Sequence, residues 1–353
     1  MAVFTPVSEQ EVHAFLRAYA VGGLRSMQGV SEGVENTNYR LECDGGVFVL
    51  TLFEKRTPPE SLPYCLALTE YAGAHGSPTP APQRTRDGAL LSTLADRPAA
   101  LLRWLPGRWS AEPTTAAAET AGQALGAFHL AGAGFPLQRD NPYGPTGWRV
   151  LIDRCAGRGD SAEQGVLAQL DREVAELTAS WPSDLPKGAI HADFFPDNVL
   201  FSGGAVTGVI DLYFACTDAL AYDLAIALNA WGFSLDGTPD AARLAAFARG
   251  YQSVRRLSDA EVAALPRLCR GAAVRFTLTR LHDRLFHDAS WLVTPHDPAP
   301  FFRRLEFHRG WEERALALRL TPLETLAVPE PQPSRPPAPP RAKGSARADP
   351  AAG

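Results

Sequence analysis

Residues 188–201, GAIHADFFPDNVLF, place several polar side chains between two apolar runs. His191, Asp193 and Asn198 stand in the order H-x-D-x-x-x-x-N, and Asp211 follows at the end of the run VTGVID. A carboxylate can take the proton of an attacking hydroxyl, while an amide oxygen and a second carboxylate can hold Mg²⁺ against ATP phosphates. This spacing therefore predicts a phosphoryl-transfer site, with Asp193 as the base.

The metal ligands depend on a predicted hairpin. The segments NVLF and VTGVID read as two short strands, and SGGA between them supplies a turn. Glycines accept the positive φ angles that tight hairpin turns require. Such a hairpin brings Asn198 and Asp211 to the same end, where both can reach one Mg²⁺ ion.

A simpler interpretation is a solvated polar turn, because an H-x-D triplet alone is weak and Asp or Asn before a strand is common turn chemistry. That interpretation does not require Asp211, and it does not require a strand-rich segment ahead of a helical one. The presence of all three features in order favours the kinase interpretation, and the spacing matches a protein-kinase catalytic loop.

The remaining elements form two groups. Ser8 and Glu11 have capping-box spacing ahead of a first helix, and strands at 24–30, 37–43 and 47–53 include a hairpin at Asp44-Gly45-Gly46. A helix is predicted at 60–74 and a second hairpin around Gly88 and Arg97. After a connector at 103–107, the chain reads as helical, notably at 114–132, 161–180 and beyond Asp218, with an irregular segment at 139–149.

Composition narrows the class of protein. The chain has 353 residues with a net charge of −5, which fits two lobes and lacks the basic footprint of a nucleic-acid-binding protein. Five isolated cysteines form no metal or disulfide pattern, and no apolar run reaches the roughly 20 residues of a membrane span. We expect a cytoplasmic protein without nucleic-acid or membrane partners, and oligomeric state is not indicated. Residues 328–353 hold eight prolines and are predicted to be disordered.

A family resemblance rests on longer passages. They are GVENTNYRL, FVLTLFE, RDNPYGPTGW, WPSDLPKGAIHADFFPDNVLF, GVIDLYFACTDALAYDLAIALNAW, RGAAVRFTLTRL and LVTPHDP. The chain resembles the aminoglycoside-phosphotransferase-like kinases over about residues 1–320, and more narrowly the homoserine kinases of that type. The resemblance implies an α+β, bilobal protein-kinase-like fold. Residues 1–105 would form the N-terminal lobe, 106–327 the C-terminal lobe, and 328–353 the tail.

The resemblance also implies roles for individual residues. Asp193 is the expected base, His191 braces its loop, and Asn198 and Asp211 hold Mg²⁺. The loop 31–38 would cover the ATP phosphates, and residues 103–105 would present backbone groups to adenine. The expected nucleotide-binding residues are Ser31, Gly33, Asn36, Asn38, Thr51, Arg103, Trp104 and Leu105.

One position departs from the wider kinase pattern. Thr51 stands on its strand where many relatives have a lysine that contacts the phosphates. Lys55 lies four residues further along, about 13 Å away on an extended strand. Either another cation serves the phosphates or Lys55 reaches back across a bend. The role of Glu70, at the place of the lysine's usual glutamate partner, is open for the same reason.

The expected acceptor is L-homoserine, a small-molecule substrate with a hydroxyl, an ammonium and a carboxylate. An arginine fork suits the carboxylate. Arg275 and Arg280 lie about 140° apart around their helix, and we favour Arg280. Tyr213, Asn229 and Trp231 are further candidates for the pocket wall.

Alternative functions remain at this point. The same fold could phosphorylate an aminoglycoside or choline, or it could serve as a non-catalytic pseudokinase. The mild acidity of residues 106–327 does not favour a polycationic acceptor, and the presence of Asp193, Asn198 and Asp211 together argues against a pseudokinase.

Elsewhere, His129 reads as a packed helix residue. Asp223 reads either as an anchor of the catalytic loop or as a plain acid at a helix start.

Overall fold

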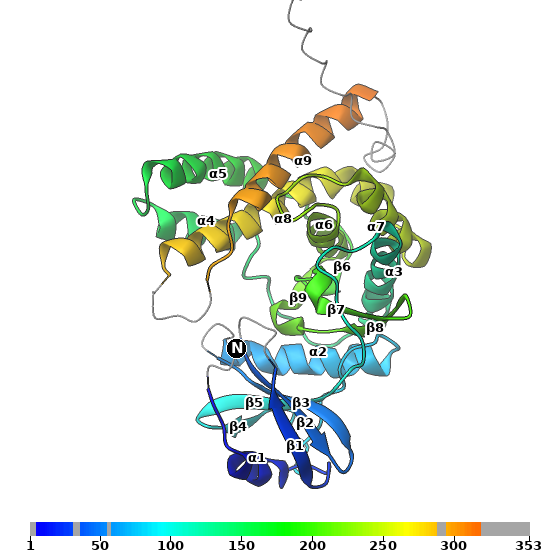
Figure 1. Ribbon diagram of the computed structural model, residues 1–353. Helices are drawn as coiled ribbons and strands as arrows, with labels where there is room; N and C mark the ends of the chain where they lie inside the picture. Colours follow the sequence, from blue (N-terminus) through cyan, green and yellow to red (C-terminus); the bar gives the residue numbers. More distant parts are fainter. Residues whose placement is uncertain (1–4, 31–35, 55–57, 288–293, 319–353) are drawn as a thin grey trace, which may run out of the picture.

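The computed structural model describes residues 5–30, 36–54, 58–287 and 294–318, with side chains in the last segment described up to Trp311. A sheet-containing lobe and a larger helical lobe are visible, and α2 (Leu62–Ala74) lies between them (Figure 1). The predicted α+β two-lobed architecture is therefore confirmed. The predictions for Ser31, Gly33, Lys55 and the tail 328–353 lie outside the described residues.

The strands of the N-terminal lobe form one antiparallel sheet in the order β1-β2-β3-β5-β4. The predicted hairpin at Asp44-Gly45 is confirmed, since Cys43 pairs with Gly46. The second hairpin turns at Ala95-Asp96, both with positive φ, instead of near Gly88. The strands are β1 (Leu24–Gly29), β2 (Thr37–Cys43), β3 (Gly46–Leu52), β4 (Ser92–Leu94) and β5 (Arg97–Arg103).

The two faces of this sheet are covered differently. Helix α1 (Glu9–Leu16) begins with the predicted capping box of Ser8 and Glu11 and packs its apolar side on the face that carries Leu50 and Leu52. The opposite face carries Phe53, Ala100 and Leu102, and it packs against α2. Because side chains alternate along β3, Thr51 points to the α2 face. That face borders the helical lobe, so the Thr51 side chain points toward the space between the lobes.

The helical lobe is built around α6, whose residues are almost all buried. Helices α3 and α7 pack closely because glycines lie at their contact. A Cβ on Gly122 would lie 2.2 Å from the Phe247 carbonyl oxygen, and one on Gly250 would lie 2.0 Å from that of Glu119. The helices are α3 (Thr115–Ala131), α4 (Pro145–Cys155), α5 (Ser161–Ala179), α6 (Leu220–Trp231), α7 (Ala241–Val254), α8 (Asp259–Leu285) and α9 (Ala299–Leu318).

Two small ladders carry the polar loop into this helical lobe. Strand β7 (Val199–Ser202) pairs with β8 (Ala205–Val209) around Gly203-Gly204, as predicted. Strand β6 (Lys187–Ile190) pairs with β9 (Cys216–Ala219), which the sequence analysis missed.

Helix α4 corrects a second prediction, because residues 145–149 are helical instead of irregular. Pro145 occupies the first turn of α4, where a missing N–H has no consequence and a fixed φ favours the helix. Among the helices that the structure describes, none combines the length and apolar content needed to cross a membrane.

Candidate active site

The loop after β6 is held in place by Asp223 of α6. Its two carboxylate oxygens accept the backbone N–H groups of His191 at 2.7 Å and Ala192 at 2.8 Å. His129 Nε2 lies 3.0 Å from the same carboxylate. Burial alone would raise the pKa of Asp223, but the hydrogen bond from His129 and the nearby imidazoles outweigh burial and hold this pKa below its usual value. Of the two interpretations of Asp223, the structure supports the loop anchor.

His129 is a buried structural residue, in agreement with its sequence interpretation. It is 3% exposed, and its Nδ1 lies 2.8 Å from the hydroxyl of Tyr251. A hydrogen-bonded chain thus runs from α7 through α3 to the carboxylate that orders the loop. Buried polar groups that are all bonded in this way rigidify the structure around them.

His191 connects the loop to the neighbouring hairpin. It is fully buried, its Nε2 lies 3.0 Å from the carbonyl oxygen of Ile210, and its Nδ1 accepts the N–H of Asp193 at 3.2 Å. Burial lowers the pKa of His191, so the ring is neutral near pH 7. A neutral ring with one donor and one acceptor fits both contacts, and this geometry suits a brace better than a reacting group.

Asp193 is partly exposed at the end of the loop, and Asn198 orients it. The Asn198 amide nitrogen donates to the backbone oxygen of Asp193 at 2.8 Å and to its carboxylate Oδ2 at 3.1 Å. These contacts fix the carboxylate without burying it. The residue before it, Ala192, has φ of +62°, a strained conformation for a residue other than glycine.

The predicted Mg²⁺ ligands lie at one end of the β7–β8 hairpin. Val199 pairs with Val209, and the N–H of Ile210 donates to the Asn198 carbonyl at 3.0 Å. The next residue, Asp211, also has φ of +62°. Because the Asn198 amide nitrogen is used by Asp193, its side-chain oxygen is left for a cation.

One amide oxygen and one carboxylate fit a nucleotide-bound Mg²⁺, which takes most of its other ligands from phosphates and water. In the described part of the chain there is no group of three or more His, Cys, Asp or Glu residues that could hold a metal alone. The donor set at Asn198 and Asp211 is therefore suited to an ion that arrives with ATP. It is not suited to a permanent metal centre.

Arg139 fixes the segment that follows Asp211. Its guanidinium donates to the carbonyl oxygens of Ala215 at 2.6 Å and Tyr213 at 3.3 Å. Its backbone exchanges two further hydrogen bonds with Thr217. Arg139 belongs to the passage RDNPYGPTGW, which gave no functional prediction by itself.

Arg275 contacts the loop on its buried side, away from solvent. It is 2% exposed and donates to the Ala192 carbonyl at 2.6 Å. Its guanidinium carbon also lies 4.6 Å from the ring centre of Phe276 and 4.9 Å from that of Tyr143. Arg275 is thus committed to the strained residue of the loop, and its prediction as a substrate-binding residue is not supported by this placement.

Thr51 and Asn38 come together on the sheet face beside Tyr213. The Thr51 hydroxyl donates to the Asn38 side-chain oxygen at 2.7 Å and lies close to the Tyr213 hydroxyl. Asn36 accepts the N–H of Glu54 at 3.2 Å. The position of the usual strand lysine is therefore filled by a neutral polar group, and three of the predicted nucleotide-binding residues lie at this edge of the space between the lobes.

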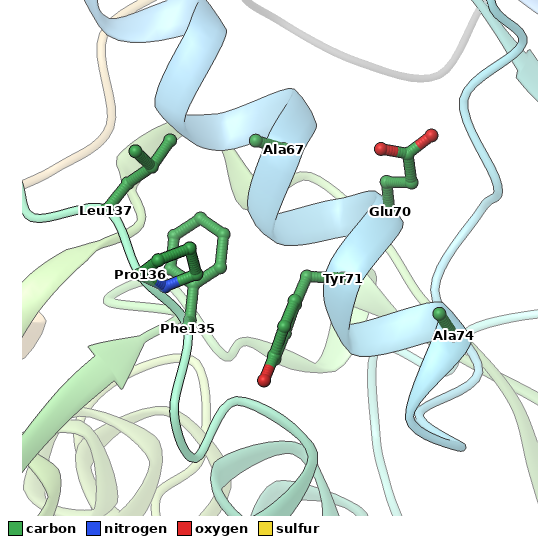
Figure 2. Close-up of a pocket in the computed structure, with 7 residues that line it drawn as sticks. All are labelled: Ala67, Glu70, Tyr71, Ala74, Phe135, Pro136 and Leu137. Atoms are coloured by element: carbon green, nitrogen blue, oxygen red, sulfur yellow. The ribbon is translucent and has the colours of Figure 1, made fainter.

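Glu70 does not face Thr51. Its carboxylate is paired with Arg84, with a distance of 2.8 Å between Arg84 Nε and Glu70 Oε1. Figure 2 shows the Glu70 carboxylate pointing away from Phe135, on the other side of α2 from the segment 135–137. The expectation that Glu70 occupies the place of the lysine's glutamate partner is therefore wrong.

Two of the three predicted hinge residues already use their backbone N–H groups in hydrogen bonds. The N–H of Arg103 donates to Ala81 and that of Trp104 to Val47, at 2.9 and 3.0 Å. Among the described residues, no hydrogen bond engages the N–H of Leu105. Of the three predicted hinge residues, Leu105 is thus the one whose N–H is not engaged within the described part of the chain.

Arg280 lies beside the catalytic loop, whereas two other predicted acceptor residues do not line an open site. Arg280 is half-buried, and its charge interacts with that of Asp193. Asn229 and Trp231 are fully buried, and the Trp231 indole donates to the Phe194 carbonyl at 2.9 Å. The prediction that Asn229 and Trp231 form a pocket wall disagrees with this structure. Both help to pack the helices beneath the loop.

A two-lobed fold in which an H-x-D loop adjoins the hairpin of the predicted metal ligands is typical of a kinase-like phosphotransferase. The model of the family described as "Phosphotransferase enzyme family" matches residues 26–257. The chain belongs to this family, and it is a small-molecule kinase.

Curated relatives narrow the comparison. The homoserine kinase of Gluconacetobacter diazotrophicus is 51% identical over 312 residues, which cover 88% of this chain and 97% of that protein. The homoserine kinase of Brucella canis is 48% identical over 315 residues, covering 89% and 97%. The resemblance to homoserine kinases that the sequence indicated is therefore confirmed.

Solved structures support the fold at much lower identity. An amicoumacin kinase in complex with AMP-PNP, Ca²⁺ and Ami superposes with a TM-score of 0.64 at 16% identity, covering 91% of this chain and 97% of that one. A microcompartment-associated aminopropanol kinase superposes with a TM-score of 0.60 at 20% identity, covering 90% and 100%. These likenesses show the kinase-like fold alone.

The sequence analysis missed two arginines, Arg139 described above and Arg304, which is 5% exposed on α9. Arg139 could have been sought in the passage RDNPYGPTGW, which already carried the family resemblance. Arg304 lies in a helix rich in charged residues, where nothing in the sequence distinguishes it from its neighbours.

Proposed function

We propose that this chain transfers the γ-phosphoryl group of ATP to the hydroxyl of L-homoserine, giving O-phospho-L-homoserine and ADP for threonine biosynthesis. The observation that carries the proposal is the near-full-length match to homoserine kinases, combined with the H-x-D loop and metal hairpin. Aminoglycoside or choline phosphorylation is not favoured by these relatives. We further propose a cytoplasmic location with no nucleic-acid or membrane partner.

Asp193 is the proposed catalytic base. Its carboxylate would accept the proton of the acceptor hydroxyl while the hydroxyl oxygen bonds to the γ-phosphorus and the bond from that phosphorus to ADP breaks. The hydrogen bond from Asn198 orients this carboxylate, and the Asp223 contacts hold the loop behind it. Positioning of this kind accounts for much of the rate that kinases achieve.

Asn198 and Asp211 are the proposed ligands of Mg²⁺. The ion would neutralise the negative charge that develops on the leaving ADP. The N–H of Leu105 would serve adenine, and the Thr51–Asn38 pair would lie near the phosphates as neutral hydrogen-bonding groups. In this proposal, the bound Mg²⁺ would supply the main positive charge that faces the ATP phosphates.

Arg280 is the proposed partner of the homoserine carboxylate. It lies on the side of the loop that carries Asp193, while Arg275 faces Ala192. Because the two arginines lie about 140° apart around their helix, they cannot both face one pocket squarely, and these contacts favour Arg280.

An acceptor panel tests the proposal. ADP release would be measured with L-homoserine, L-serine, choline and kanamycin at saturating ATP and Mg²⁺. We expect rapid release with L-homoserine and phosphorylation at its hydroxyl, confirmed by mass spectrometry. Faster turnover of kanamycin or choline would reject the proposed acceptor, and no release with any acceptor would support the pseudokinase alternative.

A further inference from the structure

Two arginines from different helices face the ring of Phe301. The guanidinium carbon of Arg280 on α8 lies 4.5 Å from the centre of this ring, and that of Arg304 on α9 lies 4.0 Å from it. Phe301 also lies 6.1 Å from Phe195, which belongs to the catalytic loop. The two cations therefore belong to the same packed cluster as Phe195 of the catalytic loop.

Arg304 is a buried cation with an incomplete set of partners. It is 5% exposed and donates to the carbonyl oxygens of Asn229 at 2.7 Å and Ser234 at 3.2 Å, near the end of α6. Its Nε has no hydrogen-bond partner, and among the described residues no carboxylate pairs with it. Burial, followed by repulsion from Arg280 and other arginines, lowers its pKa to about 9.

The helix end explains part of this arrangement, because the C-terminal carbonyls of α6 carry a partial negative charge. A partial charge does not compensate a whole buried cation, and an uncompensated buried charge is costly. Arg243, Arg303 and Arg280 add positive charge near Arg304, whereas Asp236 and Asp240, which pairs with Arg243, supply opposing charge. Arg304 itself has no carboxylate partner among the described residues.

Arg280 is the second arginine of this group, and its charge interacts with that of Asp193 in the catalytic loop. Its guanidinium donates to the backbone oxygen of Asp297 at 3.2 Å, and no ion pair joins it to a carboxylate in the part of the chain described here. Burial lowers its pKa to about 10, although Asp193, Asp297 and Asp197 act in the opposite direction. These carboxylates therefore lie near Arg280, but none forms an ion pair with it.

We propose that Arg280 and Arg304 form an anion seat that restricts the acceptor site to hydroxylated substrates bearing a carboxylate. This inference rests on the proposed function. Arg280 binds the carboxylate, and Arg304 is a positioning residue that keeps the seat positive behind Phe301. The nearby Asp197 and Asp297 suit an ammonium group, so the site matches an amino acid zwitterion.

The selectivity follows from charge. A substrate with a carboxylate supplies an anion to the seat, whereas an amino alcohol without one leaves the half-buried Arg280 and the buried Arg304 without an anionic partner and adds a third positive charge. Discrimination by unpaired polar groups is larger than discrimination by shape. Arg304 thus contributes by rejecting the wrong acceptor as much as by attracting the right one.

The test compares L-homoserine with 3-aminopropan-1-ol, which has the same hydroxyl and ammonium but no carboxylate. The quantity measured is the ratio of kcat/KM for the two acceptors. We expect a ratio of about 10³ or more for the wild type. Arg280→Met should lower this ratio roughly a hundredfold and Arg304→Met roughly tenfold, mainly by raising KM for L-homoserine.

Arg284→Met provides the matched control, since Arg284 lies one turn beyond Arg280, is exposed and pairs with Glu163. The ratio should stay at the wild-type value in this variant. Arg304→Lys keeps the charge without the planar fork and should keep most of the ratio, which tests the charge even where Arg304→Met folds poorly.

Two results overturn the inference while leaving the proposed function intact. The ratio could stay unchanged in Arg280→Met and Arg304→Met, including the case in which both acceptors lose activity equally, or Arg304→Lys could behave like Arg304→Met. By contrast, a wild-type protein that does not phosphorylate L-homoserine at all would reject the proposed function itself.

Discussion

The imidazole of His191 lies 3.0 Å from the carbonyl oxygen of Ile210, and this contact joins the two halves of the site. One half is the loop that carries Asp193, whose N–H donates to the other imidazole nitrogen at 3.2 Å. The other half is the hairpin that ends in Asp211. A single neutral ring thus sets the proposed base relative to the proposed metal ligand.

Replacing this ring should damage catalysis more than nucleotide binding. His191→Phe keeps the volume and the aromatic contacts with Phe128 and Phe194 but removes both hydrogen bonds. We expect kcat to fall at least tenfold and the free energy of unfolding to fall by about 1–3 kcal/mol, because two buried polar groups lose their partner. Steady-state kinetics and urea unfolding measure these effects. His75→Phe, at the exposed end of α2, should change neither, and a wild-type kcat in His191→Phe would contradict the bracing role.

Asp211 should matter to ATP through the metal. Asp211→Asn keeps the shape and tolerates the positive φ, but it weakens the bond to Mg²⁺. We expect ATP affinity to fall more than tenfold in the presence of Mg²⁺ and to change little in EDTA. Calorimetric titration under the two conditions measures the difference. An equal loss in both would show that Asp211 contacts the nucleotide directly or supports the fold.

Arg139 should act on the segment that follows Asp211. Arg139→Met removes the hydrogen bonds to Tyr213 and Ala215 and leaves the backbone contacts with Thr217. We expect a severalfold higher Mg²⁺ requirement for turnover, since the metal ligand loses its support. The control Arg84→Met breaks the pair with Glu70 on α2 and a hydrogen bond to the Gly88 carbonyl, both away from Asp211. If Arg139→Met lowers the melting temperature with no change in the Mg²⁺ dependence, its role is structural alone.

Two buried histidines should make the fold sensitive to acid. Burial lowers the pKa of His308 from 6.5 to about 3, and burial also lowers the pKa of His191. Below pH 6.5 the unfolded chain binds a proton that the folded chain rejects, so the free energy of unfolding falls as pH falls. The loss is about 1.4 kcal/mol per pH unit for each such histidine.

Urea unfolding between pH 7.5 and pH 5 tests this dependence. His308→Gln can keep the hydrogen bond to the Asn229 side-chain oxygen and should give a shallower fall. His13→Gln, on the exposed side of α1, should leave the slope unchanged. Identical slopes for His308→Gln and the wild type would show that His308 does not reject the proton.

Local signals account for the parts of the fold that the sequence predicted well. The capping box at Ser8, the glycine turn at Gly45 and the turn at Gly203-Gly204 each depend on neighbouring residues. The H-x-D loop was predictable for the same reason, since its polar groups are close in the chain. The structure brings Asp193, Asn198 and Asp211 together as that hairpin requires, and their catalytic roles stay predictions.

Long-range contacts account for the parts that were not predicted. Arg275 meets Ala192 across 83 residues, and Arg139 meets Ala215 across 76, so no local pattern marks either one. Glu70 was misplaced because its partner, Arg84, lies in a connector whose path depends on the whole lobe. The burial of Asn229 likewise depends on α8 and α9, which close over α6.

The most direct test of the account is the Asp193→Asn variant assayed for O-phospho-L-homoserine. The substitution keeps the shape and the hydrogen-bonding distance to Asn198 but removes the base. With ATP, Mg²⁺ and L-homoserine, we expect wild-type protein to form the product and the variant to be slower by about 10² to 10⁴, with ATP affinity within threefold of wild type. A variant that retains more than roughly a tenth of the wild-type rate, or a wild-type protein that forms no O-phospho-L-homoserine, would contradict the account.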